Sequence, residues 1–174
     1  MVREILTYPN PKLREASKDV KHFDESLHTL LDDMYETMLY KNGVGLAAIQ
    51  VGVALNALVI NPLNEEGEQN KEDLLEFINP QIIESDGIIT FQEGCLSVPS
   101  VYEEIERFQK VKVKFFDRFG KEHAEIYKDF MAVALQHEID HLRGHLFIEK
   151  LTYLKRKKFE KEWKKRIKEK AATL

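Results

Sequence analysis

The stretch LQHEIDHLRGH, from Leu135 to His145, contains the pattern His-Glu-x-x-His and indicates what lies at the centre of the fold. His137 and His141 are four residues apart, so on a helix their side chains lie one above the other on the same face. Both imidazoles can then reach one metal ion, and Glu138 stands beside the first of them as a candidate general base. The pattern by itself is typical of zinc peptidases.

The residues around the motif indicate that its metal-binding face is buried. Phe130, Val133 and Ala134 fall on the same helical face as the two histidines, because residues three or four apart share a face. Asp129 is a candidate N-cap and Gly144 a candidate stop for this helix. The alternative, a pair of histidines on a solvated face beside an exposed glutamate, is disfavoured because the apolar neighbours turn this face inward.

A catalytic metal usually takes three protein ligands and leaves one position for water. One large group of zinc peptidases places its third histidine ten residues after the first, but that position here is Phe147. Glu160 and Glu162 are further candidates, yet both lie in a strongly basic segment that is typical of a solvated helix. The stretch EGCLS, residues 93–97, contains the only cysteine. A lone cysteine is more often a small buried apolar residue, but the Cys95 thiolate would complete a Cys-His-His ligand set.

Periodicity and turn signals predict the elements around the motif helix. An amphipathic helix is expected between Asp24, a good N-cap, and the stop signal Asn42-Gly43. Strands are expected in the segments 54–62 (ALNALVINP), 74–80 (LLEFINP), 81–94 (QIIESDGIITFQEG), 110–116 (KVKVKFF) and 121–127 (KEHAEIY). The last two should form a hairpin around DRFG, and a charged helix should follow Thr152. This order predicts an α+β fold, with mostly antiparallel sheets around a central metal-binding helix, an N-terminal helix and a C-terminal charged helix.

The length of 174 residues favours one domain. We expect residues 1–150 to form the catalytic part and residues 151–174 to form a basic helix of the same domain. That last segment has ten Lys/Arg and three Asp/Glu, whereas the rest has 16 basic and 27 acidic residues. With no apolar run of membrane-helix length and no secretory or transit pattern at its start, the chain is expected to be cytoplasmic. A single cysteine excludes an internal disulfide.

Three motifs in order resemble one family, the peptide deformylases, in their type 1 bacterial form. They are GVGLAAIQ (residues 43–50), EGCLS (93–97) and HEIDH (137–141), and the resemblance extends over about residues 2–154. It implies a hydrolase that removes the N-formyl group from the N-terminal formylmethionine of nascent peptides and releases formate. It also implies a divalent metal, natively Fe²⁺, with Zn²⁺, Ni²⁺ or Co²⁺ able to replace it.

The resemblance assigns roles to individual residues. It implies that Cys95, His137 and His141 are the metal ligands and that Glu138 is the general acid and base. The Gln50 side-chain amide would then help to stabilise the oxyanion, although glutamine alone is more often a surface residue.

Further parts of the site follow from the same resemblance. The backbone N–H of Leu96 would be a second oxyanion donor. Gly45 would let the backbone approach the substrate closely. The alternative is that the glycines of this motif only mark a loop after a helix. Glu93 is expected to orient the cysteine loop by pairing with Arg107. The methionine slot would be lined by four residues that are equally plausible as core: Val44, Phe130, Val133 and Ala134.

Two features leave alternatives open. Tyr102 stands where many bacterial members of the family have an arginine, so contacts to the peptide backbone there are in question. The basic C-terminal segment is either a solvated helix with i, i+4 ion pairs or a surface for ribosomal RNA, whereas membranes and DNA are not expected partners. The competing functions are a metal-dependent peptidase or amidase with the same Cys-His-His site, and a purely structural metal domain.

Overall fold

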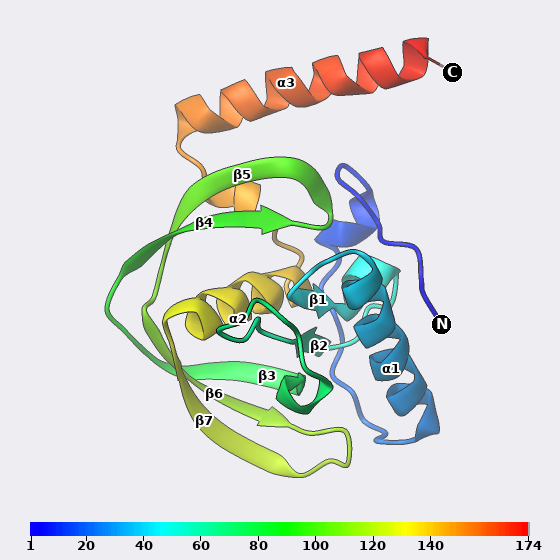
Figure 1. Ribbon diagram of the computed structural model, residues 1–174, viewed down its shortest axis with the longest axis vertical. Coiled ribbons are helices and arrows are strands. Elements are labelled where there is room, and N and C mark those ends of the chain that lie inside the picture. The colour runs from blue at the N-terminus through cyan, green and yellow to red at the C-terminus, as the bar shows by residue number, and fades with distance from the viewer. Residues whose placement is uncertain (174) are drawn as a thin grey trace.

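The computed structural model describes residues 1–173, and it confirms the α+β fold class (Figure 1). The helices are α1 (Glu25–Tyr40), α2 (Asp129–Leu142) and α3 (Tyr153–Ala172). The strands are β1 (Gly45–Ala47), β2 (Ala57–Ile60), β3 (Leu75–Asp86), β4 (Ile89–Cys95), β5 (Val98–Arg107), β6 (Lys110–Phe116) and β7 (Glu122–Lys128). They form a five-stranded antiparallel sheet in the order β1-β2-β3-β6-β7 and a two-stranded antiparallel ribbon, β4-β5.

Helix α2 lies at the centre, between the β4-β5 ribbon and the strands of the larger sheet (Figure 1). Its apolar side packs on the sheet, where Leu135 and Ile139 share one buried cluster with Phe77 and Val113. The opposite side carries the two histidines toward the ribbon. Burial of the apolar side therefore fixes the direction in which the polar side points.

Helix α1 packs on a second apolar cluster and begins where the sequence predicts. The N–H of Leu27 donates to Oδ1 of Asp24 at 3.2 Å, as expected for an N-cap. Five residues at helical spacing on α1 are buried in this cluster: Leu27, Leu30, Leu31, Met34 and Met38. They meet residues of β2 and β3, so α1 and α2 both contribute to burying the larger sheet.

The prediction that Asp129 is the N-cap of α2 is wrong. Lys128 is the N-cap, while Asp129 is the first helical residue and has a φ of +53°. The Asp129 carboxylate accepts a hydrogen bond from Nε2 of Gln109 at 3.1 Å instead of binding a helix N–H. The sharp turn from β7 into α2 therefore places this carboxylate against the β5–β6 connection.

The boundary predicted at Pro80 is also wrong, because β3 continues through it as one strand. The strand accommodates the proline at a register shift between Ile78 and Gln81, and Asn79 has a φ of +51° there. A bulge removes the need for the hydrogen bond that proline cannot donate. The chain turns instead at Gly87, whose φ is +68°.

Gly144 ends α2 as predicted. Its φ is +83°, and its N–H donates to the carbonyl of His141 at 3.0 Å while the N–H of His145 donates to the carbonyl of Asp140 at 2.9 Å. This pair of bonds is a Schellman motif. A Cβ atom at Gly144 would also overlap the backbone of Arg14, so the position requires glycine for space as well as for conformation.

Helix α3 extends along the β4-β5 side of the molecule, and its C-terminal end leads away from the body (Figure 1). Phe159 is buried and Trp163 half-buried, and both rings contact Tyr8, with centroids 5.4 and 5.6 Å away. The remaining apolar residues of the helix, such as Leu154 and Ile167, are exposed. No helix within residues 1–173 is long and apolar enough to cross a membrane.

Candidate active site

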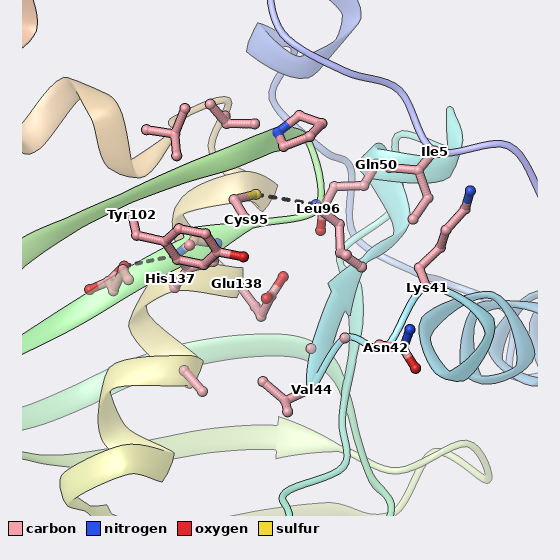
Figure 2. Close-up of a pocket in the computed structure, with 18 of the residues that line it drawn as sticks. Ile5, Lys41, Asn42, Val44, Gln50, Cys95, Leu96, Tyr102, His137 and Glu138 are labelled. Atoms are coloured by element: carbon pink, nitrogen blue, oxygen red, sulfur yellow. Dashed lines mark hydrogen bonds and ion pairs between the residues drawn. The ribbon is translucent and has the colours of Figure 1, made fainter. Parts of the chain in front are cut away.

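Three donor atoms from two elements converge on one point, with Cys95 at the end of β4 and the two histidines on α2. Figure 2 shows Cys95 and His137 facing the same pocket. The Cys95 Sγ atom lies 3.3 Å from Nε2 of His141, which lies 3.3 Å from Nε2 of His137. All three atoms lie within 4.8 Å of one another. Since two imidazoles and a thiolate suit a divalent metal with an open position, this cluster is a metal-binding site.

The surroundings of the cluster fit a metal as well. A Glu93 carboxylate oxygen accepts a hydrogen bond from Nδ1 of His137 at 2.8 Å, which leaves the lone pair of Nε2 pointing into the cluster. Burial lowers the pKa of His137, but hydrogen bonds to Cys95 and Glu93 outweigh burial and raise it well above the usual value. Burial and the neighbouring His137 lower the pKa of His141 well below it. A neutral imidazole is the form that binds metals, so an ion bound at this cluster would take the place of a proton on Nε2 of His137.

A buried charge network holds the cysteine strand against α2. Arg107 donates to both oxygens of Glu93 at 2.7 and 2.8 Å and to Asp140 at 2.6 Å. Burial raises the pKa of Glu93, but the hydrogen bonds from Arg107 and His137 outweigh it and bring the pKa to about 2. The predicted pairing of Glu93 with Arg107 is confirmed. The contact between Arg107 and Asp140 was not predicted, although Asp140 lies inside the HEIDH motif, three positions after His137.

Glu138 is buried at the edge of the cluster and lines the same pocket (Figure 2). Burial raises its pKa to about 7, opposed by the neighbouring His137. Its Oε2 atom has no hydrogen-bond partner among residues 1–173, so that oxygen is free to take a proton. A Cβ atom at Gly45 would lie only 2.6 Å from Oε1 of Glu138. Gly45 was expected to let the backbone approach the substrate closely. In the structure, the missing side chain of Gly45 lets the backbone of β1 approach the Glu138 carboxylate.

Gln50 is directed at the cysteine loop and is only 1% exposed, so the interpretation as a surface amide is wrong. Its Oε1 accepts from the N–H of Ala47 at 2.9 Å, which fixes the orientation of the amide. Its Nε2 donates to the Ser97 hydroxyl at 3.0 Å and lies 3.6 Å from Cys95 Sγ. Leu96 follows Cys95 and lines the pocket, so both expected oxyanion donors lie next to the metal cluster.

A pocket of about 970 Å³ opens over these residues. All four residues expected to form the methionine slot line it: Val44, Phe130, Val133 and Ala134. Phe91 was not predicted as a pocket residue, but it also lines the pocket and packs against Phe130 with ring centroids 5.8 Å apart. The signal that could have found it is the period of two along β4, because Phe91 and Glu93 are two residues apart and project from the same face of the strand.

Comparison with known proteins gives one family. The family model described as polypeptide deformylase matches residues 2–157. A peptide deformylase of Nautilia profundicola is 59% identical over 169 residues, which cover 97% of each chain. The crystal structure of a peptide deformylase from Legionella pneumophila superposes with a TM-score of 0.88 at 43% identity, covering 98% of each chain. A Met-Ala-Ser-bound class I type b peptide deformylase from Acinetobacter baumannii gives a TM-score of 0.80 at 31% identity, covering 87% of this chain and 99% of that one.

The sequence match, the superposition and the donor cluster agree with one another. The match spans all three motifs, and in the structure those motifs meet at a single site with Cys95, His137 and His141 as the converging donors. A buried carboxylate beside the donors completes the arrangement of a metal-dependent hydrolase. The chain belongs to the peptide deformylase family.

Proposed function

We propose that this chain hydrolyses the N-formyl group from the N-terminal formylmethionine of nascent peptides and releases formate. The observation that carries the proposal is the Cys95-His137-His141 cluster at the base of an apolar pocket, with the unpartnered Oε2 of Glu138 beside it. The Met-Ala-Ser-bound structure of the Acinetobacter baumannii relative supports a pocket that receives an N-terminal methionine.

The metal ligands proposed for this chain are Cys95, His137 and His141, and the native ion proposed is Fe²⁺, with Zn²⁺, Ni²⁺ or Co²⁺ as replacements. Thiolate and imidazole ligands suit all four of these ions. When bound, such an ion polarises a carbonyl oxygen and makes a neighbouring water more acidic. The hydrogen bond between Glu93 and His137 keeps the second ligand in the orientation that this chemistry needs.

Glu138 is the proposed carrier of the proton. It accepts a proton from the water whose oxygen attacks the formyl carbon, and it then delivers a proton to the departing nitrogen as the C–N bond breaks. The products are formate and the free amine of methionine. A carboxylate with a pKa near 7 suits both halves of this cycle, because it can hold and release a proton at neutral pH.

The Gln50 side-chain amide and the Leu96 backbone N–H are the proposed donors to the oxyanion. Gln50 is held by its own hydrogen bonds with Ala47 and Ser97, so its amide needs little reorganisation during the reaction. Each donor of this type contributes about 3 kcal/mol to lowering the barrier. Their removal should reduce kcat more than it raises KM.

The methionine side chain is proposed to enter the apolar part of the pocket. The slot is lined by Val44, Phe91, Phe130, Val133 and Ala134. Contact between the rings of Phe91 and Phe130 links the β4-β5 ribbon to α2 at this point. An unbranched, apolar side chain such as methionine fits this apolar lining better than a charged one.

Formate release from a formyl-Met peptide tests the proposal directly. We expect turnover of formyl-Met-Ala-Ser and no turnover of acetyl-Met-Ala-Ser or of an internal Met-Ala bond. Cleavage of the internal bond alone would favour the competing peptidase function. Glu138→Gln should retain the metal, as measured by elemental analysis, and lose formate release; a metal site with a purely structural role would show no turnover in either protein.

The proposed location is the cytoplasm, where nascent chains emerge, and the proposed partner is the ribosome, contacted by the basic surface of α3. Charge reversal at Lys164, Lys165 and Lys168 leaves the buried Phe159 anchor intact and therefore isolates the charge. We expect it to weaken ribosome binding, and we expect binding of the native chain to fall with salt. Binding that is insensitive to both changes would contradict the proposal.

A further inference from the structure

The connection between β2 and β3 reaches the GVGLAAIQ motif through the side chain of Gln69. Its Nε2 atom donates to the carbonyl oxygen of Gly43 at 3.0 Å and to that of Asn61 at 2.7 Å. An amide nitrogen carries two hydrogens, so one side chain can serve both carbonyls. Gly43 and Asn61 are buried, and a buried carbonyl needs a hydrogen-bond partner. Gln69 therefore satisfies two buried backbone groups, one of them in the motif.

Gln69 continues the contact between the two chain segments beyond the β1-β2 ladder. At the end of this ladder the N–H of Asn61 donates to the carbonyl of Val44 at 2.8 Å. One residue before Val44, the carbonyl of Gly43 accepts from the Gln69 amide instead of from a backbone N–H. The Asn61 side chain also holds the residue after Gln69, since its Nδ2 donates to the carbonyl of Asn70 at 2.8 Å. The Gln69 amide is thus fixed where it meets Gly43.

Gly43 and Val44 lie at the wall of the pocket. A Cβ atom at Gly43 would lie 2.7 Å from Cδ1 of Leu96, so this glycine is in close contact with the cysteine loop. Val44 lines the pocket together with Leu96 and Glu138 (Figure 2). Because the peptide that joins Gly43 to Val44 is a rigid plane, a shift of the Gly43 carbonyl also moves Val44. The pocket residues of the described chain do not include Gln69, so Gln69 can act on the pocket only through this peptide.

We propose that Gln69 is a positioning residue that holds the Gly43 peptide from outside the pocket and thereby fixes Val44 as a wall of the methionine slot. This inference rests on the proposed deformylase function. Gly45, which contacts the general base, is held instead by its pairing with Ile60 in the β1-β2 ladder. Loss of the Gln69 amide should therefore weaken binding of the methionine side chain and leave the chemical step nearly unchanged.

Gln69→Met tests the proposal, because it removes both hydrogen-bond donors and keeps a side chain of similar length. We expect KM for formyl-Met-Ala-Ser to rise about three- to ten-fold, the size expected for the loss of one or two hydrogen bonds. A rise in KM at nearly constant kcat marks lost binding. The ratio of kcat/KM between formyl-Met-Ala-Ser and formyl-Ala-Ala-Ser should fall, because alanine is too short to use the displaced wall. Gln81→Met is the control, since Gln81 is exposed on β3 and is not among the described residues of this pocket.

Binding of the peptides Met-Ala-Ser and Ala-Ala-Ser, measured by calorimetry, tests the same point without turnover. Absence of formate release in the native chain would contradict the proposed function, whereas these affinities report on Gln69 alone. Gln69→Met should weaken binding of Met-Ala-Ser several-fold more than binding of Ala-Ala-Ser.

Two outcomes would overturn the role of Gln69. One is a methionine-to-alanine ratio equal to that of the native chain, and the other is a fall in kcat as large as the rise in KM, which a merely structural role predicts. If circular dichroism shows that Gln69→Met is unfolded, Gln69→Asn takes its place. Its amide is one methylene too short to reach both carbonyls, and the same ratio decides.

Discussion

Gly45 on β1 provides the space that Glu138 on α2 occupies: a Cβ atom at Gly45 would lie 2.6 Å from the Glu138 carboxylate. The GVGLAAIQ motif and the HEIDH motif are therefore in direct contact with each other through these two residues. Because the contact is with a buried carboxylate, that side chain would have to move if a methyl group were added.

Gly45→Ala should therefore displace Glu138 and lower kcat about 100-fold, since a shift of about 1 Å in a catalytic group has an effect of that size. Metal content should stay unchanged because the three ligands are not touched. Steady-state formate release and elemental analysis measure the two quantities. Gly67→Ala is the control for kcat, because Gly67 does not line the pocket and a Cβ there meets no atom within 4 Å; its φ of +79° means that this substitution strains the backbone and lowers stability instead. Equal kcat values in the two variants would contradict the role of this contact.

Glu93→Gln should weaken metal binding by about 10- to 100-fold, because an amide is a poorer acceptor than a carboxylate for the His137 N–H. Competition with a chelator of known affinity measures the change. Glu103→Gln is the matched control, since Glu103 is the cross-strand partner of Glu93 but does not bind a metal ligand. The prediction fails if the two variants hold the metal equally well.

Arg107→Met should lower the free energy of unfolding by about 3–5 kcal/mol, because it leaves the buried Glu93 without its cation. The Arg107 and Glu93 side chains are only 2% and 4% exposed, so water cannot replace the lost partner. Denaturant titration gives the change, and Arg14→Met is the comparison. Arg14 pairs with Glu149 at the surface and should contribute only about 0–1 kcal/mol. A similar loss of unfolding free energy in both variants would mean that burial does not determine how much the Arg107 ion pairs stabilise the fold.

Asp117→Asn should lower the Tm at pH 7 by about 1–3 °C. Hydrogen bonds, first from His123 and then from two backbone N–H groups, lower the pKa of Asp117 in the folded chain. Its charge therefore stabilises the fold above the ordinary carboxyl pKa near 4, and this contribution is lost as the pH falls below that value. The difference in Tm between Asp117→Asn and the native chain should therefore become smaller at acidic pH.

Thermal unfolding at pH 7 and at pH 3 tests the Asp117 prediction. Asparagine can still accept the two turn hydrogen bonds from Phe119 and Lys121, so the variant isolates the interaction with His123. Asp86→Asn serves as a control, since Asp86 also lies at a turn but forms no ion pair among residues 1–173. A Tm difference that is constant across pH would show that the charge of Asp117 is not the cause.

Much of the fold was predictable where the signal is local. The N-cap at Asp24, the glycine stop at Gly144 and the β6-β7 hairpin depend on residues close in sequence. The predictions at Pro80 and Asp129 fail where contacts from elsewhere override a local preference, and the expected strands did not include β1 or β5. A bulge on β3 absorbs the proline, and Gln109 from the β5–β6 connection binds the carboxylate that could have capped α2.

At the site, the donor types and the spacing of the two histidines follow from the order of residues, because residues four apart on a helix face the same way whatever surrounds them. Only the tertiary structure brought Cys95 to His141, 46 residues further along the chain. That meeting requires the β4-β5 ribbon to lie across α2, where Arg107 binds both Glu93 and Asp140. Likewise, the packing of β1 against α2 sets the distance between Gly45 and Glu138. Neither segment's sequence could predict that distance without the other.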